Sequence, residues 1–234
     1  MVLIQEKGCG RMNIELINDD CLVAMKNMAD KSVDVSFTSP PYNRKRNDKY
    51  DNYEDTIEDY YNFLCNSIDE LLRVTKRYVF FNIQTTYYNK VDVYKLIGRY
   101  ADKIQQIFVW EKTNPMPSSA NSITNAYEIF IAFGDEPIKA NYSYVKNHIS
   151  TSVNTETTSD IHKAVMKQEV ADWFIDNFTT DGDVILDCFM GLGTTCISCK
   201  KYGRNFIGIE IDKDYFEMAK SRIDSVGMIK KKLW

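Results

Sequence analysis

The segment Thr38–Asn43 (TSPPYN) combines hydrogen-bond acceptors with a rigid backbone. Successive prolines restrict the chain and lack an N–H, so their carbonyl oxygens are available as acceptors. An amino group conjugated to an aromatic ring is a poor nucleophile. If Ser39 accepts a hydrogen bond from one N–H of this amino group and the Pro40 carbonyl accepts one from the other, the nitrogen becomes tetrahedral. It can then attack an electrophilic carbon. Fixed dipoles then meet the developing positive charge.

A second segment, Asp183–Thr195 (DVILDCFMGLGTT), is predicted to be a strand, a glycine turn and the start of a helix. Gly191 and Gly193 permit a tight bend close to a ligand, and the N–H groups at a helix start can hold an anionic group. Glu210 lies 23 positions beyond Asp187, near the offset of about 20 residues at which an acid meets ribose hydroxyls. The third glycine of the nicotinamide fingerprint is missing. An acid beside the turn can pair with an ammonium group, which favours a cofactor that carries an amino acid.

Strands and helices alternate along most of the chain. Hydrophobic and β-branched patterning predicts seven strands, at residues 13–18, 32–38, 78–83, 104–110, 127–133, 183–187 and 205–210. Helical spacing predicts helices at residues 20–28, 56–74, 90–100, 166–178, 194–200 and 214–223. This order predicts an α/β fold with three layers and a mostly parallel sheet. TSPPYN then lies at the carboxyl edge, where open α/β sheets bind ligands.

The composition predicts an ordinary globular protein. The 234 residues, 44% hydrophobic and 26% charged, suit a single domain over residues 1–234. The sequence has neither an apolar run long enough for a membrane helix nor an N-terminal secretory pattern, so we expect a cytoplasmic protein without membrane contact. The six cysteines are then expected to be reduced. Cys196 and Cys199 are interpreted as packing residues and no metal site is expected, because the only histidines are His148 and His162.

The two segments together carry a family resemblance. TSPPYN followed by DCFMGLGTT resembles the DNA amino-methyltransferases, in the permuted beta class whose catalytic motif precedes the cofactor motif. The resemblance covers nearly the whole chain and implies S-adenosyl-L-methionine as cofactor. It also implies a Rossmann-like methyltransferase fold with a seven-strand sheet, closed by a hairpin from Ile104 to Phe133.

The resemblance assigns residues to the site. The catalytic residues are Ser39, Pro40, Pro41 and Tyr42, with Tyr42 able to stack on a base swung out of the duplex. The cofactor-binding residues are Asp20, Asp187, Phe189, Gly191, Gly193, Thr194, Thr195 and Glu210. The segment Trp110–Pro117 resembles the lining of the target-base side, and His162–Ala164 resembles the cradle for the cofactor's methionine end.

Basic residues suggest where DNA is held, although the net charge of −4 argues mildly against nucleic acid. A cluster directly after Tyr42 is expected to hold phosphates around the extruded base; it consists of Arg44, Lys45, Arg46 and Lys49. The alternative is that this cluster lies in a solvent-exposed loop and does not contact DNA. Residues 134–161, rich in Asn, Ser, Thr and Tyr, are predicted to be a small target-recognition insertion in which Lys139 and Lys146 contact DNA.

The recognition segment is short, so either the recognised DNA sequence is short or a second subunit contributes to reading it. A homodimer and a restriction endonuclease partner are both left open. Serine before Pro-Pro-Tyr favours cytosine N4 as the target, because Ser39 is a neutral acceptor, whereas aspartate would be the more typical residue for adenine N6.

Three other functions are alternatives to methylation of a DNA base. Related Pro-Pro-Tyr turns also serve methyltransferases that act on RNA or on protein amides. The chain could be a catalytically inactive module that binds DNA or cofactor, which the intact TSPPYN disfavours. An oxidoreductase is the weakest alternative, because the third glycine is missing.

Overall fold

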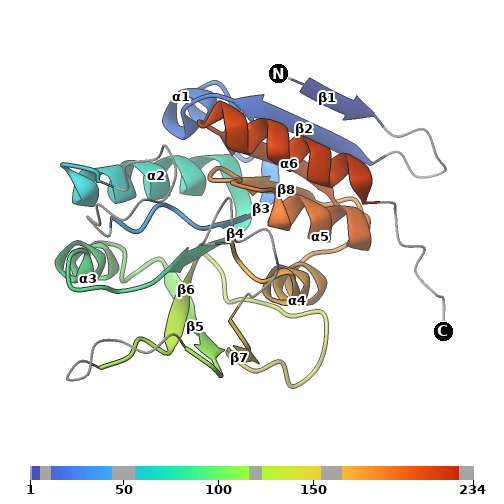
Figure 1. Cartoon of the computed structure of the whole chain (residues 1–234). Helices are drawn as coiled ribbons and strands as arrows, with labels where there is room; N and C mark the ends of the chain where they lie inside the picture. Colours follow the sequence, from blue (N-terminus) through green and yellow to red (C-terminus); the bar gives the residue numbers. More distant parts are fainter. Residues whose placement is uncertain (1, 6–11, 44–55, 116–122, 154–164, 227–234) are drawn as a thin grey trace.

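A computed structural model describes residues 2–5, 12–43, 56–115, 123–153 and 165–226. Its centre is a nine-stranded sheet in the order β1-β2-β9-β8-β3-β4-β6-β5-β7 (Figure 1). The strands are β1 (Val2–Gln5), β2 (Asn13–Asn18), β3 (Val33–Thr38), β4 (Thr75–Ile83), β5 (Ile104–Lys112), β6 (Tyr127–Phe133), β7 (His148–Thr151), β8 (Val184–Asp187) and β9 (Asn205–Glu210). The helices are α1 (Cys21–Lys26), α2 (Tyr60–Val74), α3 (Lys90–Arg99), α4 (Gln168–Phe178), α5 (Thr194–Tyr202) and α6 (Lys213–Ser225).

The prediction of a three-layer α/β fold is confirmed, but the expected number of strands is wrong. All seven predicted strands form, and two short strands extend the sheet at its edges. β1 pairs antiparallel with β2, and β7 pairs parallel with β5. Each has four residues, too few for a periodic pattern to reveal them. β7 lies inside residues 134–161, so part of the predicted insertion belongs to the sheet.

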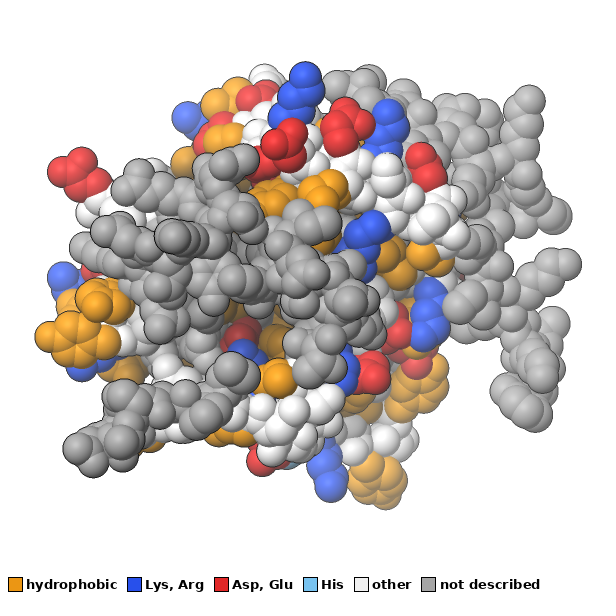
Figure 2. Space-filling view, viewed as in Figure 1, with side chains coloured by type: hydrophobic (Ala, Val, Ile, Leu, Met, Phe, Trp, Pro, Cys, Tyr) orange, Lys and Arg blue, Asp and Glu red, His pale blue; other side chains and the backbone are white. Residues whose placement is uncertain are grey.

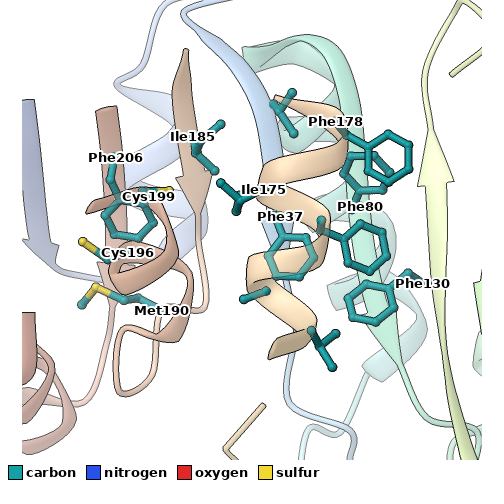
Figure 3. Packing of buried hydrophobic residues seen from close by; sticks show 14 of the residues in the cluster. Phe37, Phe80, Phe130, Ile175, Phe178, Ile185, Met190, Cys196, Cys199 and Phe206 are labelled. Atoms are coloured by element: carbon teal, nitrogen blue, oxygen red, sulfur yellow. The ribbon is translucent and has the colours of Figure 1, made fainter. Parts of the chain in front are cut away.

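The helices cover the sheet on both faces. α4, α5 and α6 contribute to one buried hydrophobic cluster, and α1, α2 and α3 contribute to the other. Alternation along the strands supplies both clusters, since β4 sends Phe80 to the first and Phe81 to the second. Figure 3 shows the first cluster, with Phe178 of α4 beside Phe80 and the thiols of α5 near Phe206.

The direction of the strands decides where ligands can bind. β2, β9, β8, β3 and β4 run parallel to one another, so their carboxyl ends share one edge of the sheet, called here the catalytic edge. β6 runs antiparallel to β4 and β5, which forms the predicted hairpin. No helix in the described part of the chain is both long and apolar enough to cross a membrane.

Candidate active site

The two motifs meet at the carboxyl ends of β3 and β8. Thr38 Oγ1 donates to Asp187 Oδ1 at 2.7 Å, across a separation of 149 residues in the sequence. Thr195 Oγ1, in the first turn of α5, donates to the other oxygen of Asp187 at 2.6 Å. Asp187 is therefore bonded to both motifs, and TSPPYN and the glycine turn line adjoining parts of one edge.

Asp187 is buried, and burial raises the pKa of its carboxyl, while the hydrogen bonds from Thr195, Thr38 and the Phe189 N–H oppose that rise. We expected this carboxylate to pair with a ligand ammonium. Among the described residues its hydrogen-bond partners are Thr38, Thr195 and the Phe189 N–H, which hold it between β3 and α5. Its observed role is to join the two motifs.

The glycine turn is shaped for a close ligand. Gly191 and Gly193 have φ of +51° and +78°, a left-handed conformation that glycine adopts readily. Gly193 is the N-cap of α5, and a side chain at Gly191 would meet no atom within 4 Å. Open space beside the start of a helix is the arrangement that lets backbone N–H groups approach a ligand. Phe189 is half-buried and packs against Phe63 of α2, with ring centroids 5.7 Å apart.

Glu210 ends β9 beside this turn. Its Oε2 accepts from the Gly191 N–H at 2.8 Å and its Oε1 from the Asp212 N–H at 2.9 Å. An ionised carboxylate has about four acceptor positions, so each oxygen keeps capacity for a further donor, such as a ribose hydroxyl. Burial raises the pKa of Glu210, and the two backbone hydrogen bonds counteract that rise.

Asp20 lies next to Glu210 at the catalytic edge, because Asn18 pairs with Glu210 in the parallel ladder of β2 and β9. Its Oδ1 accepts from the Leu22 and Val23 N–H groups and caps α1. Asp20 therefore has a structural role in addition to the predicted cofactor contact. Thr194 is buried in the first turn of α5.

The Pro-Pro-Tyr turn is held in place from several elements. Tyr60 of α2 donates to the Pro41 carbonyl at 2.7 Å, and Asn89, just before α3, donates to the Tyr42 carbonyl at 2.7 Å. In the described part of the chain, no hydrogen bond occupies the Pro40 carbonyl. This oxygen therefore has no protein donor there that would compete with a substrate amino group.

A polar network missed from the sequence surrounds Ser39 and Tyr42. Ser39 Oγ lies 3.1 Å from both Tyr42 Oη and Asn82 Oδ1. Tyr42 Oη lies 2.6 Å from Asn82 Oδ1 and 2.8 Å from Glu128 Oε2. Glu128 in turn forms an ion pair with Lys112. A polar residue inside the otherwise apolar strand YVFFNI was the available signal for Asn82, and an acid opening the strand YEIFIAF was the signal for Glu128.

The predicted DNA contacts are not all at this edge. β6 runs antiparallel to β4, so its last residue, Phe133, lies at the edge of the sheet opposite the catalytic edge. The chain after Phe133 starts from that opposite edge. There the Lys139 N–H donates to Tyr78 Oη at 3.1 Å, near the amino end of β4. The structure therefore does not bring Lys139 to the catalytic residues. Lys146 precedes β7, which runs back toward the catalytic edge and pairs Thr151 with Lys112.

Other predicted contacts lie outside the described residues. These are Arg44, Lys45, Arg46 and Lys49 of the basic cluster and the segment His162–Ala164. On the face seen in Figure 2, basic and acidic side chains of the described residues are interspersed, without one continuous basic patch. Phosphate binding is therefore not assigned to the described part of that face.

Comparison with known proteins resolves the family. The sequence pattern of the N6/N4 DNA methylases, described as DNA methylase, matches residues 33–221 and so includes both motifs and the network between them. The chain belongs to the N6/N4 DNA methylase family. The chain is 30% identical over 231 residues to the Type II methyltransferase M.MwoI of Methanothermobacter wolfeii, and the match takes in 91% of the chain but 34% of M.MwoI. It thus spans about a third of that relative's length.

Solved structures have the same fold as this chain. The PvuII DNA methyltransferase, named as cytosine-N4-specific, superposes with a TM-score of 0.74 at 18% identity, over 95% of this chain and 88% of that one. The complex of M1.HpyAVI with S-adenosylmethionine superposes with a TM-score of 0.66 at 24% identity, over 90% of this chain and 99% of that one. The resemblance to the DNA amino-methyltransferases is thereby confirmed, and so is the expected fold.

Proposed function

We propose that this methylase transfers a methyl group from S-adenosyl-L-methionine to the exocyclic amino group of a base in DNA, with cytosine N4 as the preferred target. The observation that carries the proposal is the hydrogen bond from Thr38 to Asp187, which joins a turn of amino-group acceptors to a glycine turn suited to a cofactor. Family membership supports the same reaction.

The described residues fit the cofactor. The open space at Gly191 admits a close ligand, and Glu210 has acceptor capacity for a ribose diol beside it. Asp20 lies at the same edge for the adenine, with Phe189, Thr194 and Thr195 completing the proposed pocket. When bound, S-adenosylmethionine supplies an electrophilic methyl group.

The Pro-Pro-Tyr turn acts on the base. Ser39 Oγ and the Pro40 carbonyl each accept a hydrogen bond from one N–H of the amino group. These two bonds turn the nitrogen lone pair out of conjugation with the ring. Tyr42 stacks on the extruded base, and the Pro41 carbonyl, bonded to Tyr60, keeps the turn rigid. These residues bind and orient the amino group for attack on the methyl carbon.

Ser39 supports cytosine over adenine. A serine hydroxyl is a neutral acceptor, and its own proton has either Asn82 Oδ1 or Tyr42 Oη as a partner, each at 3.1 Å. Nucleoside mass spectrometry of plasmid DNA from cells that express the methylase tests the choice. N4-methylcytosine is the expected product, N6-methyladenine alone would reverse the base assignment, and unmodified DNA would contradict the proposal as a whole. A Ser39→Ala variant serves as the control and should leave the DNA unmodified.

We also propose how DNA and partners are engaged. The basic cluster of Arg44, Lys45, Arg46 and Lys49 holds phosphates beside the extruded base. Within residues 134–161, the described strand β7, which runs toward the catalytic edge, contacts the target sequence. Because that stretch is short, a homodimer would supply the missing contacts. Analytical ultracentrifugation with and without duplex DNA distinguishes a dimer from a monomer.

A further inference from the structure

A buried ion pair lies beside the Pro-Pro-Tyr turn, between strands that neither motif includes. Lys112 of β5 and Glu128 of β6 are diagonal neighbours across the hairpin, since Trp110 lies opposite Glu128, and their side chains are only 16% and 7% exposed. Burying two charges is costly, and an ion pair of this kind is weak evidence for stability by itself. Its second contact suggests a function, because the other oxygen of Glu128 lies 2.8 Å from Tyr42 Oη.

The network contains a continuous path of hydrogen bonds from Ser39 to Glu128. Ionised Glu128 can only accept, and Lys112 can only donate to it. The Tyr42 hydroxyl has two acceptors in reach, Asn82 Oδ1 at 2.6 Å and Glu128 Oε2 at 2.8 Å. When it donates to Glu128, its oxygen can accept from Ser39 Oγ at 3.1 Å. Asn82 Oδ1 offers an acceptor to the same hydroxyls, and its Nδ2 donates to the Ile129 carbonyl at 3.2 Å. In this arrangement Ser39 donates into the network, which leaves its lone pairs to accept from the amino group.

We propose that Glu128 is the final acceptor of the proton that the target amino group must lose, reached through Ser39 and Tyr42. As the amino nitrogen forms its bond to the methyl carbon, the bond from that carbon to sulfur breaks and the nitrogen becomes positive. One N–H proton then passes to Ser39 Oγ, the Ser39 proton passes to Tyr42 Oη, and the Tyr42 proton passes to Glu128. The N–H electron pair stays on nitrogen, and the carboxylate becomes a neutral carboxyl.

The groups around Glu128 suit this role. In the described residues, the charged and titratable groups bonded to it are Lys112 from β5 and Tyr42 from the loop after β3. The Lys112 ammonium compensates the charge of the Glu128 carboxylate in the ion pair. A methylated aromatic amino group that retains its extra proton is strongly acidic, so a paired carboxylate can still accept that proton.

The proton also has a path out of the site. Glu128 lines a cavity of about 90 Å³ together with Tyr94 and Tyr127. Both tyrosines are more than half exposed, at 60% and 51%, so the cavity walls reach the surface. Water in this cavity can take the proton from Glu128 and restore the carboxylate for the next turnover.

This inference rests on the proposed function, and Glu128→Gln tests it. The amide keeps the size of the side chain but cannot take up the proton. General-base catalysis contributes about 10²- to 10⁴-fold, so we expect the single-turnover methylation rate to fall at least about 10²-fold. The Kd for S-adenosylmethionine and for DNA, measured by calorimetry, should stay unchanged. Tyr42→Phe breaks the same path, and the double variant should be no slower than the slower single variant.

A matched control uses a tyrosine–carboxylate pair elsewhere. Tyr100 Oη donates to Asp69 at 2.6 Å between α2 and α3, and Asp69→Asn should leave the rate unchanged. If Glu128→Gln unfolds, Glu128→Ala with added formate replaces it, and formate but not chloride should restore the rate. A full single-turnover rate in Glu128→Gln would overturn the role of Glu128 but not the proposed function. Rate losses that multiply in the double variant would do the same. A wild-type chain that methylates no DNA would overturn the proposed function as well.

Discussion

Thr38 Oγ1 and Asp187 Oδ1 are 2.7 Å apart, although 149 positions of sequence separate the two residues. Thr38 is followed by the Pro-Pro-Tyr turn, and Asp187 is followed by the glycine turn. A single buried hydrogen bond therefore joins the bases of the two turns. The Phe189 N–H, 3.2 Å from Asp187 and 3.3 Å from Thr38, reinforces the same junction.

Replacing Thr38 with valine should weaken both stability and cofactor binding. Valine has the same shape but no hydroxyl, which leaves Asp187 with one donor fewer. The loss of a buried partner costs about 1–3 kcal/mol, and urea unfolding should show a decrease of that size. Calorimetry should show weaker S-adenosylmethionine binding, because the glycine turn after Asp187 is less well held.

Ser36→Ala is the control for this substitution. Ser36 lies on the same strand and is also buried, and its Oγ is 2.7 Å from Thr75 Oγ1, away from the cofactor motif. It should lose stability without losing cofactor affinity. Equal affinity losses in the two variants would show that the Thr38–Asp187 contact has no special role in the site.

Binding of S-adenosylmethionine should weaken on acidification. Burial raises the pKa of Glu210, so this carboxyl takes up a proton at a higher pH than an ordinary glutamate. Only the ionised form can accept from both backbone N–H groups and from a ribose diol. Affinity should therefore be full above the raised pKa and fall as the pH drops through it. Glu210→Gln should bind about 10- to 100-fold more weakly at neutral pH, since hydrogen bonds to charged groups contribute about 1.5–3 kcal/mol.

Titration calorimetry over a pH series measures this dependence. Asp187 also has a raised pKa, so Glu210→Gln should reduce the pH dependence without abolishing it. An affinity in the wild type that stays constant from neutral to acidic pH would contradict the assignment of Glu210.

Gly193 should tolerate alanine less well than Gly191. Both have positive φ, and a left-handed conformation costs an L-residue about 1–2 kcal/mol. A Cβ at Gly193 would also lie 3.0 Å from Ile223 Cδ1 and 3.4 Å from Ala219 Cβ on α6, whereas a Cβ at Gly191 meets nothing within 4 Å. Urea unfolding should therefore show the larger loss for Gly193→Ala. Similar losses of unfolding free energy in the two variants would mean that α6 shifts to accommodate the added methyl group.

The salt dependence of DNA binding should identify the residues that contact phosphates. Each contact contributes about 0.9 to the slope of log K against log salt. Replacing Arg44, Lys45, Arg46 and Lys49 with glutamine should reduce that slope for duplex DNA, as measured by fluorescence anisotropy. Lys139→Gln should leave it unchanged, because Lys139 lies near the amino end of β4. A loss of slope only in Lys139→Gln would place DNA at the opposite edge.

The sequence by itself determined the two motifs, their permuted order, seven strands and the three-layer class. These features are local: alternation identifies strands such as Val33–Thr38, and glycines and prolines mark the turns that follow them. It also placed both motifs after buried strands, and in a parallel sheet such positions share an edge.

Only the tertiary structure decided which side chains complete the site. Asn82, Lys112 and Glu128 come from strands paired across the sheet. Asn82 and Glu128 contact Tyr42 across 40 and 86 positions, beyond any local pattern, and Lys112 pairs with Glu128. The edge strands β1 and β7 form because neighbouring ladders hold them, not because of their own periodicity. The antiparallel course of β6 sends Lys139 to the far edge. Long-range hydrogen bonds and strand direction depend on how the elements pack, and a residue pattern read along one chain does not contain that arrangement.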